Sequence, residues 1–213
     1  MKRINWRYAL GELLIVTTGI MIAFGLNNWG GELKDRDQKQ VYLLSIKEDL
    51  LNDIRQLDSN VAEIERRMKY LERLRPHLYG RLPKRDSMAM GIFKATDPVS
   101  FRPQDHTIQS LQFSGDLKLI SDLELKNRIM AHYSLYEEVE LESERHINFA
   151  KDYMAKYYMT EIDYTKFRTG EGAAFMDDPY FHNLVFALSG IYVIEHKAQR
   201  KALESARAMV ELL

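Results

Sequence analysis

Residues 8–29 read YALGELLIVTTGIMIAFGLNNW and form a long apolar run near the start of the chain. Between Arg7 and Glu32 the only charged side chain is that of Glu12. An α-helix rises about 1.5 Å per residue, so this interval is long enough to cross a hydrocarbon core of about 30 Å. Aromatic side chains, which favour the headgroup level, stand near both ends: Trp6, Tyr8 and Trp29. The pattern predicts a transmembrane helix.

Two alternatives to a membrane span fit the run less well. A buried helix of a soluble protein rarely carries so long an uncharged stretch. A cleaved signal peptide has an apolar region of about 7 to 15 residues followed by a small-x-small cleavage site. The sequence that follows the run here, GLNNWGG at 25–31, offers no such site. The sequence therefore favours a retained span.

The charges that flank the run set its expected orientation. Basic residues stand on both sides in equal number: Lys2, Arg3, Arg7, Lys34, Arg36 and Lys39. The leading charges belong to a very short tail, and the trailing ones alternate with acidic residues, which count little in the positive-inside rule. We expect residues 1–7 to form a short cytoplasmic tail, residues 8–29 to cross the lipid bilayer, and residues 32–213 to form a helical extracytoplasmic domain.

The overall composition argues against several classes of function. The chain has 30 basic and 31 acidic residues, which leaves no positive surplus of the kind that nucleic-acid binding generally requires. It contains no cysteine, so disulfides, thiol catalysis and thiolate metal sites are excluded. Roughly 180 residues after the run are enough for one domain with its own core. We expect one domain and no nucleic-acid partner.

A heptad pattern predicts a long helix at 37–77. Its apolar positions alternate spacings of four and three: Leu50, Ile54, Leu57, Val61, Ile64, Met68 and Leu71. We expect Gly30 and Gly31 to separate this helix from the span, and Arg75-Pro76 to end it, because a residue before proline is pushed away from helical geometry. The partner of this narrow seam is either another helix of the same domain or a second copy of the chain.

The segment after this helix is expected to be a connection. Residues 80–103 are punctuated by prolines and leave room for one short helix near 87–93. A second amphipathic piece follows at 104–113, and Gly115 is well placed as its C-terminal stop. We therefore expect two short helices between the long ones.

Two further long helices follow. Ser121 and Glu124 form a capping box that starts a helix reaching about Thr160. Its apolar face is largely aromatic: Leu125, Ile129, Tyr133, Tyr136, Val139, His146, Phe149, Tyr153 and Tyr157. A polar loop at 166–177 precedes the last helix, which begins at Pro179. An aromatic stripe of this kind is usually core, although it could also floor a ligand pocket.

No segment shows sustained period-two alternation, so the fold is expected to be all-α, with an N-terminal transmembrane helix followed by a long-helix antiparallel bundle or coiled-coil-like domain. A second span at Phe181–Ile194 is the rival to a single-pass topology. Its apolar run of about 10 to 14 residues is short, since a span needs about 20. We expect it to be a core helix instead.

Motifs that carry enzyme chemistry are missing. The chain has no His-Glu-x-x-His, no Glu-x-x-His and no Gly-x-Ser-x-Gly, so we expect no catalytic residues, no cofactor and no metal site. Glu142 and His146 stand one turn apart, but a lone pair of this kind is usually a surface contact or a core histidine. His132, beside the aromatic face, is expected to be a hydrogen-bonded structural histidine.

The span itself carries candidates for helix association. Glu12, Gly19, Ala23 and Asn27 fall close to one helical face. Small residues let helix backbones approach closely in a bilayer, and a charge within a span tends to face protein or water. We expect this stripe to meet a second copy of the chain or another membrane protein.

Several of these stretches resemble a known family. The motifs are YALGELLIV at 8–16, the following Gly-Ile-x-Ile-Ala, Asn-Asn-Trp at the end of the span, YLLSIKEDLLNDI at 42–54 and, in the middle of the chain, residues 107–129. They are similar to a family of uncharacterised small bacterial single-pass membrane proteins. The chain departs from that pattern at Thr17-Thr18 and Gly25. The resemblance implies a location in the bacterial inner membrane, and it implies no activity. Together with the orientation expected from the flanking charges, this location would place the C-terminal domain in the periplasm.

Two classes of function follow from these features. The first is a membrane-anchored structural or interaction protein that docks a partner or self-associates, and it accounts for the seam and the small-residue stripe. The second is an extracytoplasmic ligand-sensing module that acts through a separate partner protein. We expect the first class, and we do not expect an enzyme.

Overall fold

The computed structural model describes residues 6–83 and 86–213, and within these ranges the chain is helical without a strand. This confirms the predicted all-α class. Residues 1–5 of the predicted cytoplasmic tail lie outside the described residues. The elements are α1 (Trp6–Leu78), α2 (Asp86–Thr96), α3 (His106–Ser114), η1 (Asp116–Leu119), α4 (Leu123–Phe149), η2 (Ala150–Ala155), α5 (Lys156–Thr160), η3 (Tyr164–Arg168), η4 (Gly172–Asp177) and α6 (Pro179–Leu212).

Helix α1 is continuous from the apolar run into the domain, so the expected break at Gly30 and Gly31 is wrong. A glycine inside a helix costs only about 1 kcal/mol relative to alanine, and the strong helix formers on both sides outweigh two of them. The helix also passes Pro76 and ends at Leu78, slightly beyond the expected stop. Gly80, at φ 70°, takes the left-handed conformation that turns the chain away.

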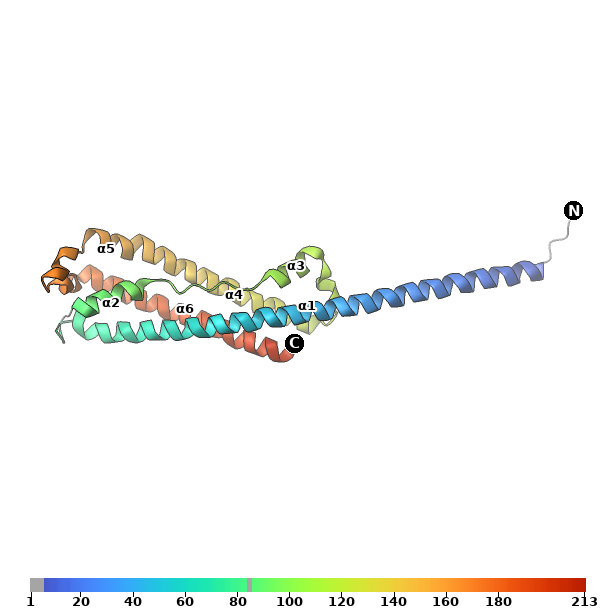
Figure 1. Cartoon of the computed structure of the whole chain (residues 1–213), viewed down its shortest axis with the longest axis horizontal. Coiled ribbons are helices and arrows are strands. Elements are labelled where there is room, and N and C mark those ends of the chain that lie inside the picture. The colour runs from blue at the N-terminus through green and yellow to red at the C-terminus, as the bar shows by residue number, and fades with distance from the viewer. Residues whose placement is uncertain (1–5, 84–85) are drawn as a thin grey trace.

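The N-terminal part of α1 projects from the rest of the molecule as a single helix (Figure 1). An 18-residue window in this part is 0% buried, and among the described residues α1 is the one helix that is long and apolar enough to cross a membrane. Packing against the domain begins near Gln38 and Tyr42, which donate hydrogen bonds to the Asp116 carboxylate at 3.1 and 2.8 Å.

The domain is a bundle in which α6 runs antiparallel to α1 and α4 (Figure 1). The predicted seam faces the core: Leu50, Leu57 and Ile64 are at 0% exposure and Leu71 at 1%. The seam positions between them are partly buried: Ile54, Val61 and Met68. The seam packs chiefly against α6 of the same chain, which decides between the two partners that the heptad left open. The segment Phe181–Ile194 lies within α6, and one of its faces is buried in this core, as expected of a core helix: Phe181, Leu184, Val185, Leu188 and Tyr192. Its other face is exposed and carries Phe186, Val193 and Ile194.

Helix ends follow the local signals with one correction. The N-cap of α4 is Asp122, not Ser121: its carboxylate accepts the N–H groups of Glu124 and Leu125 at 2.9 and 3.1 Å. Aspartate caps as well as serine does, so the helix starts one residue later than the capping box predicts. Gly115, at φ 76°, ends α3 as predicted, and Pro179 opens α6 as predicted.

The long helix that was expected to reach Thr160 does so, but a π-helical segment, η2, interrupts it between α4 and α5. The insertion shifts the register of the side chains that follow it, because each π turn holds more residues than an α turn. No glycine or proline marks the segment in the sequence, so periodicity alone does not reveal it.

Candidate functional site

The predicted association residues lie together on the projecting part of α1. Glu12, Gly19, Ala23 and Asn27 are all exposed. A Cβ atom built on Gly19 meets no atom within 4 Å, so a helix could approach its backbone closely. Within the part of the chain that the structure describes, nothing covers this face.

The same face of α1 continues as an apolar surface beside the bundle. Val41, Leu44 and Leu51 are 62%, 62% and 45% exposed, although they stand in the helix that carries the core seam. At about 100° per residue, Val41 and Leu44 lie within roughly 40° of the direction of Glu12, whereas the buried Leu50 lies roughly 160° away. We name these seven positions the outer face of α1: Glu12, Gly19, Ala23, Asn27, Val41, Leu44 and Leu51.

The sequence prediction found only the half of the outer face that lies in the span. It missed the other half because Gly30 and Gly31 were expected to break the helix, and a break would have removed any fixed angular relation between the two halves. The seven-residue spacing of Leu44 and Leu51 was the available signal.

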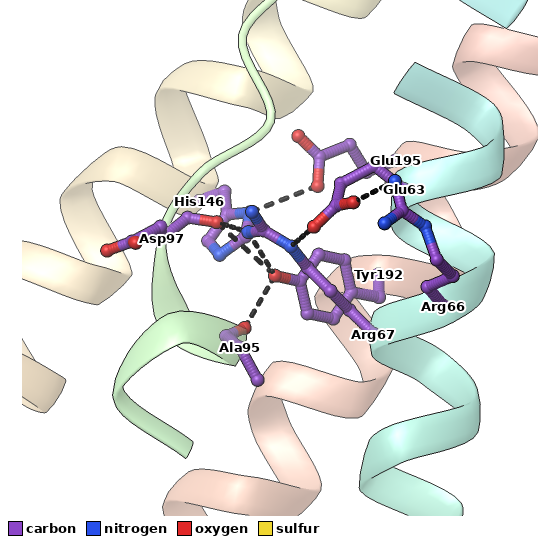
Figure 2. A network of polar contacts seen from close by, with 8 residues as sticks. All are labelled: Glu63, Arg66, Arg67, Ala95, Asp97, His146, Tyr192 and Glu195. Carbon is purple, nitrogen blue, oxygen red and sulfur yellow. Dashed lines mark hydrogen bonds and ion pairs between the residues drawn. The ribbon is translucent and has the colours of Figure 1, made fainter. Parts of the chain in front are cut away.

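A polar layer crosses the middle of the bundle and joins its helices (Figure 2). Its centre is the pair formed by His146 of α4 and Glu195 of α6, whose Nδ1 and Oε2 atoms lie 3.0 Å apart, with both side chains at most 1% exposed. The ring of Tyr192 lies edge-on to His146, with the ring centroids 4.9 Å apart. Glu195, whose carboxylate pairs with His146, is 49 residues away in the sequence, so no local motif predicts the pair.

Arg67 of α1 extends this layer to the end of α2. It donates to the Tyr192 hydroxyl at 3.1 Å and to the carbonyl of Asp97, while its Nε donates to Glu63 at 2.8 Å. The Tyr192 hydroxyl donates in turn to the carbonyl of Ala95 at 2.6 Å. The hydrogen bond from Arg67 lowers the pKa of Glu63, and burial raises the pKa of Tyr192.

The layer can fix the register of the helices, because its hydrogen bonds join α1, α4 and α6 in one arrangement. Two of its buried atoms, Nε2 of His146 and Oε1 of Glu195, have no partner among the described residues. It is enclosed in the core, with His146 and Glu195 both at 0% exposure, so these two side chains do not face solvent. Its geometry is that of a structural network.

The two histidines singled out by the sequence are both buried. His132 places its Nδ1 atom 2.9 Å from the Ser205 hydroxyl, and burial lowers the pKa of its imidazole to about 4. Glu142 does not share a ligand with His146: it pairs with Arg145 at 2.7 Å, whereas His146 turns into the core toward Glu195. Across the described residues, no group of three or more histidine or acidic side chains is arranged to hold a metal ion.

Comparison with known proteins finds a family model that matches part of the chain. No curated protein and no solved structure matches the chain. The family match covers the outer face and the core seam of α1 together, and it does not extend to the resembling residues 107–129. At 12–81, which is nearly the whole of α1, the chain matches the family of unknown function DUF6090.

Proposed function

We propose that this chain is a membrane-anchored interaction protein that self-associates in parallel through the outer face of α1. The observation that carries the proposal is the exposure of Val41 and Leu44 on the same continuous helix as Gly19 and Ala23. The core seam of α1 is already filled by α6, so the outer face is the one that remains for a partner.

One half of the outer face lies in the proposed membrane span and the other half lies in water, and each half favours association for a different reason. In the bilayer, where apolar side chains gain nothing by leaving lipid, Gly19 and Ala23 favour association because they allow close backbone packing. In water, full burial of a valine or leucine side chain contributes about 1.5 to 3 kcal/mol, so Val41 and Leu44 favour the same contact by a different force. Because α1 is one continuous helix, a parallel dimer can form contacts through both halves of the outer face.

The proposed setting is the bacterial inner membrane, crossed once by residues 8–29, with residues 32–213 in the periplasm. The resemblance and the flanking charges support this setting, and the bundle then stands above the membrane on a helical stalk. A second copy of the chain is the proposed partner, and the proposed role includes no catalysis.

Disulfide crosslinking tests the dimer directly, because the chain has no cysteine of its own. Ala23→Cys and Leu44→Cys place single thiols on the outer face, and Asp35→Cys places one at an exposed position roughly 140° away. In oxidised native membranes we expect crosslinked dimers from the first two variants and little from the third. Equal crosslinking of all three, or none from Leu44→Cys, contradicts a dimer along this face.

A pair of bulky substitutions provides a second readout. Gly19→Leu with Ala23→Leu should separate the helices and weaken self-association in a membrane two-hybrid assay. Met21→Leu, roughly half a turn from Ala23, is the matched control and should leave the signal unchanged. An unchanged signal from the double variant, with normal membrane insertion, counts against the proposal.

The continuous α1 also favours a second candidate function. A rigid helix that joins the bundle core to the span can transmit a shift from one to the other, as a ligand-sensing module that acts through a partner protein requires. A ligand for the bundle is the missing element of that function.

A further inference from the structure

The aromatic stripe of α4 and α5 leaves the core before it ends. Its buried positions follow a heptad spacing through α4, with Val139, Ser143 and His146 all buried. The same spacing continues through residue 150 and predicts that Tyr153 is buried. Instead, Met154 is buried at 0% exposure and Tyr153 is 53% exposed. The buried position has therefore moved by one residue.

The π-helical segment η2, Ala150–Ala155, accounts for this shift. The hydrogen bonds of a π turn span one residue more than those of an α turn, so the side chains that follow it rotate relative to the core. Single π turns within α-helices are rare and are frequent at functional sites. Here the result is that one aromatic ring of the stripe turns from the core to the surface.

The exposed ring lines a pocket of about 400 Å³. The aromatic part of the lining comes from Tyr153, from Tyr157 of α5 and from Tyr180 of α6. Tyr180, like Tyr153, is about half exposed, at 49%. The volume falls within the range of about 300 to 1,000 Å³ that is usual for small-ligand sites. Two half-exposed rings thus stand in a concave site of ligand size.

The aromatic wall of this pocket is held in place by contacts within the chain. The Tyr157 hydroxyl donates to the Asp178 carboxylate at 2.8 Å, and the same carboxylate accepts the backbone N–H of Tyr180 at 2.8 Å. The rings of Tyr157 and Tyr180 have their centroids 5.8 Å apart, and Tyr153 stacks on Phe149 at 5.7 Å. A wall that is already ordered lowers the entropic cost of binding a ligand.

The polar side chains of the pocket carry both signs of charge. Asp152 and Glu161 supply hydrogen-bond acceptors, and Lys156 supplies donors. All three side chains are exposed, and none forms a hydrogen bond or an ion pair within the described residues. The carboxylates oppose an anionic ligand and Lys156 opposes a cationic one. A neutral ligand with several hydroxyl groups can use both kinds of side chain, because each hydroxyl donates and accepts.

A sugar ring is complementary to both parts of this lining. The flat side of a pyranose ring carries C–H groups, and its edge carries hydroxyl groups. The face of a tyrosine ring is electronegative and attracts the slightly positive hydrogens of such C–H groups. The hydroxyl groups at the edge of the sugar then meet the free donors and acceptors of the pocket.

The pocket lies far from the proposed membrane span. Helix α5 stands at the end of the bundle that is remote from the projecting part of α1 (Figure 1). At about 1.5 Å per residue, the stretch of α1 from Trp29 to Leu78 places that end roughly 70 Å from the headgroup level of Trp29. Lipid headgroups of the same membrane are therefore out of reach. This placement rests on the proposed anchoring, whereas the chemistry of the pocket does not.

We propose that this pocket binds a neutral carbohydrate. One sugar ring lies against Tyr153 and Tyr180. Its hydroxyl groups donate to Asp152 and Glu161 and accept from Lys156. Binding does not depend on self-association through α1, and it supplies the ligand that the second candidate function lacks.

Calorimetric titration of the full chain with cellobiose and with N,N′-diacetylchitobiose tests the proposal, in a detergent that has no sugar headgroup. Tyr153→Ala should weaken binding about tenfold or more, because the stacking surface is lost. Tyr153→Phe keeps the ring and should bind more tightly than Tyr153→Ala. Phe186→Ala removes an exposed ring outside the pocket and is the matched control, which should bind as the unmodified chain does.

The polar part of the site has its own test. Asp152→Asn with Glu161→Gln should weaken binding severalfold, because hydrogen bonds to charged acceptors are stronger than those to neutral ones. Circular dichroism of each variant verifies the fold, and Tyr180→Ala provides a second ring deletion if Tyr153→Ala does not fold.

Three results overturn the proposal. They are no heat of binding with either disaccharide at millimolar concentration, equal binding by Tyr153→Ala and Phe186→Ala, and tighter binding of choline than of both disaccharides, which would make the tyrosines a cation site. Loss of dimer crosslinking leaves these measurements unaffected, so the carbohydrate site and the dimer are tested separately.

Discussion

At the residue scale, the polar layer explains how the bundle selects one packing. The apolar seam alone tolerates sliding, because leucines at neighbouring turns are interchangeable. His146 and Glu195 are not interchangeable with their neighbours, since a slip by one turn would leave each buried polar side chain without its partner. The pair thus contributes specificity more than net stability.

The energetic consequence can be measured by a double-mutant cycle. His146→Leu leaves Glu195 buried without its partner and should lower the free energy of unfolding by about 3 to 5 kcal/mol. The double variant His146→Leu, Glu195→Leu should lose less than the sum of the single changes, because neither buried polar side chain is then left without its partner. Denaturant unfolding followed by circular dichroism gives each value.

An exposed ion pair is the control for this cycle. Lys201 and Glu138 lie 2.9 Å apart with about half of each side chain exposed, and Lys201→Gln should cost less than about 1 kcal/mol. Additive losses at His146 and Glu195 would show that the two side chains do not act as a pair.

His132 predicts a pH dependence. Burial lowers its pKa from 6.5 to about 4, so the unfolded chain binds a proton that the folded chain refuses between these values. The contribution of His132 to stability is complete above pH 6.5 and is lost as the pH falls toward 4. The difference in the free energy of unfolding between the unmodified chain and His132→Gln should therefore shrink as the pH falls from 6.5 to about 4.

Asp53 acts with the opposite sign, which makes the comparison specific. Burial raises its pKa from 3.8 to about 6, so its contribution is complete below pH 3.8 and is lost as the pH rises through 6. Asp53→Asn should remove that second dependence and leave the first in place. A pH profile unchanged by His132→Gln would refute the assignment to His132.

At the element scale, α1 presents three different surfaces along one axis. Its first part is exposed all round, its core seam is buried against α6, and its outer face is exposed from Val41 to Leu51. The bundle half of α1 is thus covered on one side only, and its other side is free for the proposed dimer contact.

The core seam predicts that alanine substitutions at a buried position and at an exposed position two residues away differ widely in their effect on stability. Leu57 is 0% exposed, and Leu57→Ala should cost about 2 to 5 kcal/mol through lost burial and the cavity left behind. Ser59→Ala, two residues away at an exposed position, should change stability by less than about 0.5 kcal/mol. Thermal unfolding of both variants makes the comparison, and similar losses would contradict the burial of the seam.

The sequence was sufficient where the signal is local. The heptad spacing identified Leu50, Leu57 and Ile64 as core, and turn chemistry placed Gly115 and Pro179 at helix ends. The sequence was not sufficient where the structure depends on competing helix propensities or on contacts between residues far apart in the chain. Whether Gly30 and Gly31 break a helix depends on the helix formers around them, and the partners of His146 and of Asp53 lie on other helices.

At the scale of the whole molecule, the arrangement of the ends constrains topology. Helix α6 ends near the point where α1 leaves the bundle, whereas the C-terminal end of α1, which precedes the turn at Gly80, lies at the far end (Figure 1). The core of the bundle buries one apolar face of α6, which includes Phe181, Leu184 and Leu188. With one crossing, both the turn and the end of α6 must lie on the same side of the membrane.

Reporter fusions test this arrangement and its orientation. Alkaline phosphatase, active only outside the cytoplasm, should be active when fused after Leu213 and when inserted near Gly80, and green fluorescent protein should be dark at both sites. Activity near Gly80 without activity after Leu213 would mean a second crossing through α6. If the phosphatase is inactive and the fluorescent protein is bright at both sites, the span is inverted and the bundle lies in the cytoplasm. A single crossing is the expected outcome, because a second crossing through α6 would remove Phe181, Leu184 and Leu188 from the bundle core in which they are packed.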